Sequence, residues 1–192
     1  MSERRVPMLG HDDARAAAAE AGIPEYMAEL SVFRIVLHQP GVATALNGML
    51  HALLFKGRLD GRLRELIIMR IGWVTGSVYE WTQHWRVATQ LGMTPEDICG
   101  VRDPEHHDYG ASERAVLAAT DETLQTGTIS PETFADCRRH LGGDDVMVEM
   151  VAAIGNWRLF SQLLRSLDVP LEEGVQAWPP DGRVPPAAGG PS

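Results

Sequence analysis

Three side chains suited to proton transfer lie close together in the sequence, at Glu65, Glu80 and His84. Glu80 and His84 are four residues apart, so on a helix they share one face, where a carboxylate can orient an imidazole and raise its pKa. We expect His84 to act as an acid or base that Glu80 positions. Glu65 would be a second proton carrier, or the group that orients the imidazole.

Polar and aromatic side chains near these three could contact a substrate. Ser77 and Tyr79 could donate hydrogen bonds to a substrate oxygen. Arg70 could bind a substrate carboxylate. Trp73 and Trp81 would exclude water from the reacting groups, although packing in the core is the more common fate of a tryptophan.

A purely structural interpretation of the same residues stays open. Ser77 and Glu80 have the S-x-x-E spacing of a capping box, which would begin a helix at this point. Trp81 and Trp85 could form an apolar stripe with Ala88. A structural ion pair with Glu65 could come from a nearby arginine, for which the sequence offers Arg62, Arg64 and Arg70.

The run ELIIMRIGWVTGSVYEWTQH, residues 65–84, resembles the carboxymuconolactone decarboxylase family, which includes the AhpD-type alkylhydroperoxidases. In the redox branch of that family a glutamate precedes a CxxC motif, and a histidine follows the second cysteine by four residues. This sequence keeps the spacing with Glu65, Ser77, Glu80 and His84. The resemblance covers most of residues 40–173 and implies an all-α, AhpD-like fold that assembles as a homotrimer or homohexamer.

The two cysteine positions of the redox motif hold Ser77 and Glu80 here, and Cys99 lies outside it. Thiol peroxidase chemistry needs a thiolate and a resolving partner. The departure favours the non-redox branch, with a cofactor-independent carboxy-lyase or isomerase that acts on a small oxo- or lactone-containing carboxylic acid, as in aromatic compound degradation. Two alternatives stay open: an AhpD-like alkylhydroperoxidase with an antioxidant role, and a non-catalytic helical oligomer for binding or scaffolding.

We expect neither a metal nor an organic cofactor. Glu65, Glu80 and His84 could bind a divalent ion as two carboxylates and one imidazole, but no second histidine is clustered with them, and His106 and His107 lie in an acidic loop. The sequence also has no glycine-rich phosphate loop, no GxSxG motif and no dinucleotide fingerprint.

Helical periodicity runs through the chain, and no stretch alternates with a period of two. A hydroxyl residue followed by proline and glutamate predicts helix starts at Thr94 and Ser130, and Gly92 and Gly142 stand where helices should end. The sequence therefore predicts an all-α fold with helices over residues 12–21, 42–55, 62–74, 78–91, 111–124, 131–141 and 145–167.

The length of 192 residues suits one helical domain, which we place over residues 1–178. Residues 179–192, rich in proline and glycine, have too little to bury and are predicted to be a disordered tail. A faint similarity between residues 65–73 and 149–157 could mark two related helical halves, but helices resemble one another easily.

The net charge of −9 argues against nucleic acid as a partner, because a phosphate backbone would be repelled. No apolar run is long enough for an export signal or a membrane span. The two distant cysteines define no disulfide framework, so we expect a cytoplasmic protein. The expected partners are a small carboxylic acid substrate and further copies of the chain.

Overall fold

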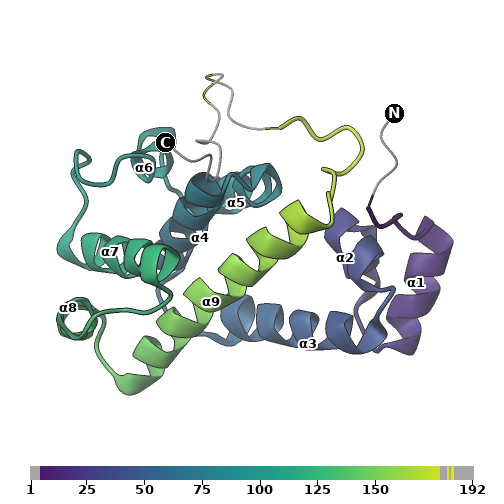
Figure 1. Ribbon diagram of the computed structural model, residues 1–192, viewed down its shortest axis with the longest axis horizontal. Coiled ribbons are helices and arrows are strands. Elements are labelled where there is room, and N and C mark those ends of the chain that lie inside the picture. Colours follow the sequence, from purple (N-terminus) through teal and green to yellow (C-terminus); the bar gives the residue numbers. More distant parts are fainter. Residues whose placement is uncertain (1–4, 178–180, 182, 184–192) are drawn as a thin grey trace. The chain divides into compact units, whose positions relative to one another are not determined.

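The computed structural model describes residues 5–177, 181 and 183, and these residues form helices and loops without a strand (Figure 1). They fall into two compact units. The terminal unit comprises the described residues of Met1–Lys56 and Gln162–Gln176, and the central unit comprises Gly57–Ser161 and the described residues of Ala177–Ser192. The all-α prediction is confirmed, whereas the single domain over residues 1–178 stays a prediction.

The terminal unit begins with α1 (His11–Glu20), as the alanine-rich pattern predicts. Two short elements that the pattern does not predict follow it, the 3-10 helix η1 (Glu25–Glu29) and α2 (Ser31–Val36). Next comes α3 (Pro40–His51), which continues as one π-helical stretch, η2 (Ala52–Lys56). The helix predicted over residues 42–55 therefore begins at Pro40 and becomes π-helical from Ala52.

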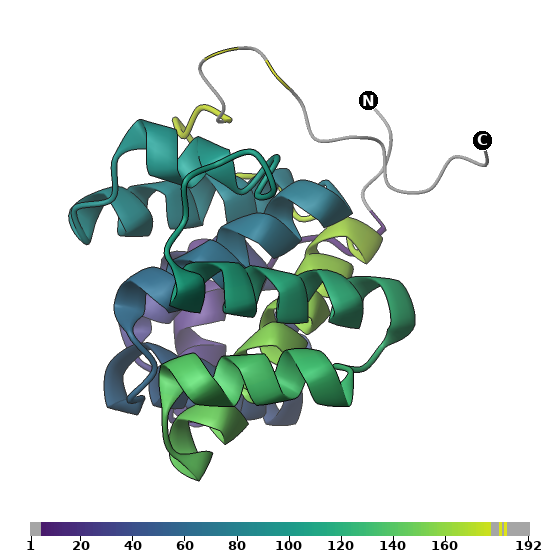
Figure 2. The same cartoon turned by 90° about the vertical axis from the view of Figure 1, so that its left-hand side faces the viewer.

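The central unit holds the helices that carry the candidate site. α4 packs against α5 and α7, and α7 packs against α8 (Figure 2). α9 belongs to this unit as far as Ser161. The elements are α4 (Gly61–Thr75), α5 (Val78–Gln90), α6 (Pro95–Gly100), α7 (Ala111–Thr126), α8 (Pro131–Leu141) and α9 (Asp144–Ser166).

A two-residue turn joins α4 to α5 and brings the two helices close together. Gly76 ends α4 in the left-handed conformation at φ 71°, which costs glycine little. The amide of Ser77 then donates to the carbonyl of Gly72 at 2.9 Å. A β-carbon placed on Gly72 would lie 3.3 Å from the backbone nitrogen of Trp81, so the absence of a side chain there permits the close approach.

The predicted caps are confirmed at two helix starts and wrong at a third. Thr94 accepts from the amide of Asp97 in a capping box, and Ser130 accepts from the amide of Thr133. Ser77 occupies the N-cap of α5, but its side chain makes no capping hydrogen bond. The S-x-x-E capping box is therefore wrong, because the Glu80 side chain lies beside His84 instead.

A glutamate of α9 anchors the chain just ahead of α4. One carboxylate oxygen of Glu149 accepts from the amides of Arg58 and Leu59, at 2.6 and 3.0 Å. Gly57 leaves room for this carboxylate, since a β-carbon there would collide with it. The contact fixes where α9 lies along the start of α4.

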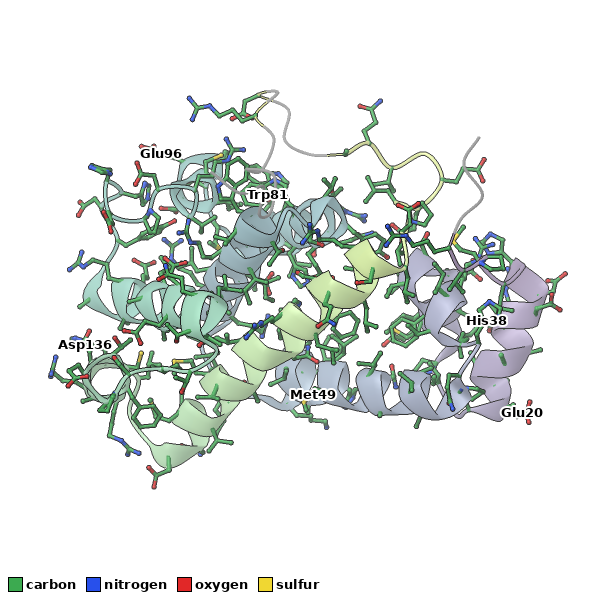
Figure 3. All side chains as sticks on the ribbon, in the orientation of Figure 1. Glu20, His38, Met49, Trp81, Glu96 and Asp136 are labelled. Carbon is green, nitrogen blue, oxygen red and sulfur yellow. The ribbon has the colours of Figure 1, made fainter. Side chains whose placement is uncertain are left out.

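Aromatic side chains of α4 and α5 pack in the core of the central unit. Trp81, labelled in Figure 3, is 1% exposed and belongs to a cluster with Ala88, against which Trp73 and Trp85 also pack. The predicted apolar stripe is thus confirmed. Within the described part of the chain, none of the helices combines the length and apolar character that a membrane span requires.

Most of the predicted tail, residues 179–192, lies outside the described residues. The two described positions are Asp181 and Arg183. Asp181 forms an ion pair with Arg102 at 2.6 Å.

Candidate active site

Glu65 and His84 form a hydrogen-bonded pair between the facing sides of α4 and α5. The Nδ1 atom of His84 lies 2.7 Å from Oε2 of Glu65, which is fully buried. The other oxygen of Glu65 accepts from Nε of Arg64 at 3.1 Å. Glu65 therefore orients the imidazole, and of the three arginines that the sequence offers, Arg64 is the one that pairs with it.

Glu80 meets the opposite edge of the same imidazole. Its Oε2 atom lies 3.4 Å from Nε2 of His84, one helical turn along α5. The Glu80 side chain is 7% exposed and that of His84 is 12% exposed. The structure thus brings together the three residues that the sequence singled out for proton transfer.

A fourth residue, Trp157 of α9, completes the surroundings of the imidazole. Its indole Nε1 donates to Nε2 of His84 at 3.1 Å, and the two rings stand nearly perpendicular, at 85°. Trp157 is 1% exposed. Sequence reasoning did not select this residue, because it lies 73 residues from His84 and belongs to no local motif.

Burial controls the protonation of Glu80. Removal from water favours the neutral acid, and the charge of Glu65 adds to this, whereas the charge of His84 opposes it. Together they raise the pKa of Glu80 to about 7. Glu80 can therefore hold and release a proton near neutral pH.

His84 experiences opposing effects. Burial lowers its pKa, but the charge of Glu65, the hydrogen bond to Glu65 and the charge of Glu80 outweigh burial, while Arg64 again lowers it. The net result is a raised pKa for His84. Two proton-binding groups, each with a raised pKa, thus face each other across 3.4 Å.

Ser77 supplies a buried hydroxyl at the N-cap of α5, the helix that carries Glu80 and His84. It is 1% exposed, and its Oγ finds no hydrogen-bond partner among the described residues. A buried hydroxyl without a partner is costly and indicates a place where a polar group or water binds. Tyr79, also predicted to contact substrate, is buried.

The other predicted substrate contacts lie in different surroundings. Arg70 forms a two-pronged ion pair with Asp121, at 2.7 and 3.0 Å, and donates to the carbonyl of Val101. The alternative pairing of Arg70 with Glu65 is therefore wrong. The guanidinium of Arg102 lies over the rings of Trp73 and Trp81, 4.6 and 5.3 Å from their centroids.

Neither cysteine has the features of a reactive thiolate. Cys137 is buried with Sγ 3.3 Å from the carbonyl of Ala115, and burial raises its pKa to about 11. Burial also raises the pKa of Cys99. Across the residues that the structure describes, no group of three or more His, Cys, Asp and Glu side chains is arranged to hold a metal ion.

Comparison with known proteins places the candidate site within a family match. Residues 40–122 match the model of the carboxymuconolactone decarboxylase family, and the match includes Glu65, Glu80 and His84. The search of curated proteins found no match.

Several solved structures share the fold. An uncharacterised peroxidase-related protein from Ralstonia eutropha JMP134, with an alkylhydroperoxidase AhpD core, has a TM-score of 0.72 at 18% identity, covering 90% of this chain and 94% of that one. The debrominase Bmp8, as a cysteine-to-alanine variant with bound 2,3,4-tribromopyrrole, has a TM-score of 0.70 at 18% identity, covering 89% and 93%.

A third similar structure is a protein of unknown function from Agrobacterium tumefaciens, for which an AhpD role in antioxidant defence has been suggested. Its TM-score is 0.65 at 20% identity, covering 71% of this chain and 94% of that one. At these identities the likeness establishes the fold, and the predicted AhpD-like helical architecture is confirmed.

Proposed function

We propose that this chain, whose residues 40–122 match the carboxymuconolactone decarboxylase family, is a cofactor-independent lyase for a small carboxylic acid that contains an oxo or lactone group. The observation that carries the proposal is the buried set of Glu65, His84 and Glu80, linked at 2.7 and 3.4 Å. Such a set can hold one transferable proton away from water. The reaction would be decarboxylation or a related isomerisation.

Decarboxylation needs a group that accepts the electron pair of the broken bond and a donor of one proton. The bond between the substrate carbon and its carboxylate breaks, carbon dioxide leaves, and the electron pair moves into the conjugated oxo or lactone group as an enolate. One proton from the pair of Glu80 and His84 is then transferred to carbon, and water restores the proton to the site. The buried hydroxyl of Ser77 is suited to stabilise the enolate oxygen.

The absence of thiols from the motif separates this proposal from a peroxidase. A serine and a glutamate stand where AhpD-type chemistry needs two cysteines, and burial raises the pKa of both Cys99 and Cys137. A thiol that is held protonated is a poor nucleophile. The proton transfer of the proposed reaction uses carboxyl and imidazole groups and needs no thiol.

The cost of burial favours catalysis over a scaffolding role. Burying carboxylates and an imidazole beside one another destabilises a fold unless each is paired, and apolar residues of similar volume often stabilise more. Strongly perturbed titratable groups gather at functional sites for this reason. We also propose that the chain assembles as a homotrimer or homohexamer, as the family resemblance implies.

The test is a screen of β-oxo acids and of carboxylated lactones, which measures carbon dioxide release and incorporation of deuterium from heavy water. For any substrate found, Glu80→Gln and His84→Gln should each reduce kcat about 100-fold or more, because general acid–base groups typically contribute that much. Arg86→Gln is the matched control, since Arg86 is exposed on the same helix.

An unchanged kcat for His84→Gln would refute the mechanism. Replacing both Cys99 and Cys137 by serine separates the proposal from a peroxidase. Lyase activity should survive that double replacement, whereas cysteine-dependent turnover of peroxide would establish the redox alternative instead.

A further inference from the structure

Both ring nitrogens of His84 already have partners within the protein. Nδ1 lies 2.7 Å from the carboxylate of Glu65, and Nε2 lies 3.1 Å from the indole nitrogen of Trp157. An indole nitrogen can only donate a hydrogen bond. The Nε2 atom must therefore present a lone pair toward Trp157, which is possible only if Nε2 carries no proton.

We propose that Trp157 is a positioning residue that holds His84 in its neutral Nδ1–H form and so keeps the exchangeable proton of the site on Glu80. This inference rests on the proposed function for its catalytic meaning. It assigns the role of proton donor to Glu80. His84 orients the carboxyl group of Glu80 and can receive a proton from it.

The competing arrangement places that proton on Nε2 of His84 and leaves Glu80 as a carboxylate. It would point two N–H groups, one from the imidazole and one from Trp157, at each other across 3.1 Å. The ring would also lose a hydrogen bond that the neutral form makes. Trp157 thus disfavours protonation of His84 at Nε2, whereas the carboxylates of Glu65 and Glu80 favour protonation.

Among the described residues, the charged groups that act on the imidazole come from α4 and α5. Glu65 and Arg64 face it from α4, and Glu80 faces it from α5, while Trp157 faces it from α9. Of these, the carboxylates of Glu65 and Glu80 attract the proton to His84, and Arg64 repels it. The neutral indole is therefore the group that can fix the tautomer without adding charge.

The first measurement needs no substrate. Two-bond proton–nitrogen NMR correlations of histidine-labelled protein distinguish the Nδ1–H form, the Nε2–H form and the imidazolium. The chain has seven histidines, and the His84 signals are those missing from the spectrum of His84→Gln. The wild-type protein should show the Nδ1–H form at pH 6, where Glu80 still holds its proton, and an imidazolium or an Nε2–H form there would overturn the inference.

The second measurement replaces the donor and keeps an aromatic ring. Trp157→Phe should raise the pKa of His84 by about one unit, a tenfold change in its protonation equilibrium, as expected when one hydrogen bond to the neutral form is lost. Trp85→Phe is the matched control, because Trp85 neighbours His84 in sequence but packs against the core cluster. It should leave the pKa and tautomer of His84 unchanged.

An unchanged tautomer and pKa of His84 in Trp157→Phe would overturn the inference, as would equal shifts in the two variants. If Trp157→Phe does not fold, the wild-type tautomer alone decides. The NMR readouts need no substrate. A failed screen for lyase activity would therefore refute the proposed function without affecting the test of the role of Trp157. With a substrate in hand, the pH profile of kcat should shift in Trp157→Phe and not in Trp85→Phe.

Discussion

At the scale of single residues, Glu80 is the side chain whose surroundings differ most from those of an ordinary glutamate. It is buried and lies next to an imidazole and a second buried glutamate. Its pKa of about 7 makes it neutral over a range of pH in which an unfolded chain would carry it as a carboxylate. This difference links the protonation of one residue to the stability of the protein.

Glu80→Gln should make stability less dependent on pH. The folded protein keeps a proton on Glu80 up to about pH 7, whereas the unfolded chain loses it near 4.5. The contribution of this group is therefore fully present below pH 4.5 and is lost as the pH rises through 7. Over that window the wild-type protein should lose on the order of 3 kcal/mol of unfolding free energy that the variant retains.

Urea denaturation at pH 5 and pH 8 measures this effect. The exposed Glu132, replaced by glutamine, serves as the control for removing one carboxyl group. Parallel losses of stability in the wild-type protein and in Glu80→Gln would contradict the raised pKa.

Glu65→Ala should be among the most destabilising single substitutions in the central unit. It removes a fully buried carboxylate that contacts both Arg64 and His84. Breaking a buried ion pair by deleting one partner typically costs about 3 kcal/mol or more. Glu65→Gln, which keeps the shape and one acceptor, should cost less, and equal costs for the two variants in urea denaturation would argue against a role for the charge.

At the scale of elements, the helical hairpin of α4 and α5 sets the geometry of the site. Glu65 and His84 stand on opposite arms of the hairpin, and the turn at Gly76 fixes how the arms align. Gly72 fixes how closely they approach. The separation of the arms is therefore determined by the backbone more than by the reacting side chains.

Gly72→Ala should destabilise the protein by about 1 kcal/mol or more, although alanine has the higher helix propensity. The added β-carbon would lie 3.3 Å from the backbone of Trp81 and 3.6 Å from the β-carbon of Glu80, and neither can move without shifting α5. Gly155→Ala in α9 is the matched control, because nothing lies within 4 Å of its β-carbon. Thermal denaturation should show a lower Tm for the first variant and an equal or higher Tm for the second.

The long helices could be predicted from sequence, and the short or irregular ones could not. Apolar residues at helical spacing predicted the lengths of α4 and α9 closely, because periodicity accumulates over many residues. The six residues of α2 and the π-helical end of α3 give too short a pattern. Their conformations depend on tertiary contacts that a local pattern does not contain.

The candidate site was predictable only where its residues share one motif. The spacing of Glu65, Glu80 and His84 pointed to a common site, and the structure brings the three together. The same local pattern also fitted a capping box. Spacing alone does not determine whether the Glu80 side chain contacts the backbone amide of the N-cap or the imidazole of His84. Trp157 could not be predicted as part of the site from sequence, because its contact with His84 depends on how α9 packs.

At the scale of the whole molecule, the chain is acidic, with a net charge of −9, and its described residues form two compact units. The candidate site lies entirely within the central unit. Subunit association remains a proposal drawn from the family resemblance.

Sedimentation velocity tests that proposal directly. A homotrimer or homohexamer should sediment with a mass three or six times the 21.0 kDa of one chain. The species should persist on dilution through the micromolar range, as expected for an obligate oligomer. A single species of 21.0 kDa at all concentrations would rule out both assemblies.

The anchoring of α9 by Glu149 makes two backbone amides distant reporters of the site. Glu149 precedes Trp157 by eight residues, about 12 Å along a helix, so one rigid segment holds both the anchor and the indole. A slide of this segment that withdraws Trp157 from His84 would also pull the Glu149 carboxylate from the amides of Arg58 and Leu59. Hydrogen exchange at those two amides should therefore report how often the hydrogen bond between Trp157 and His84 is broken, without any probe in the site itself.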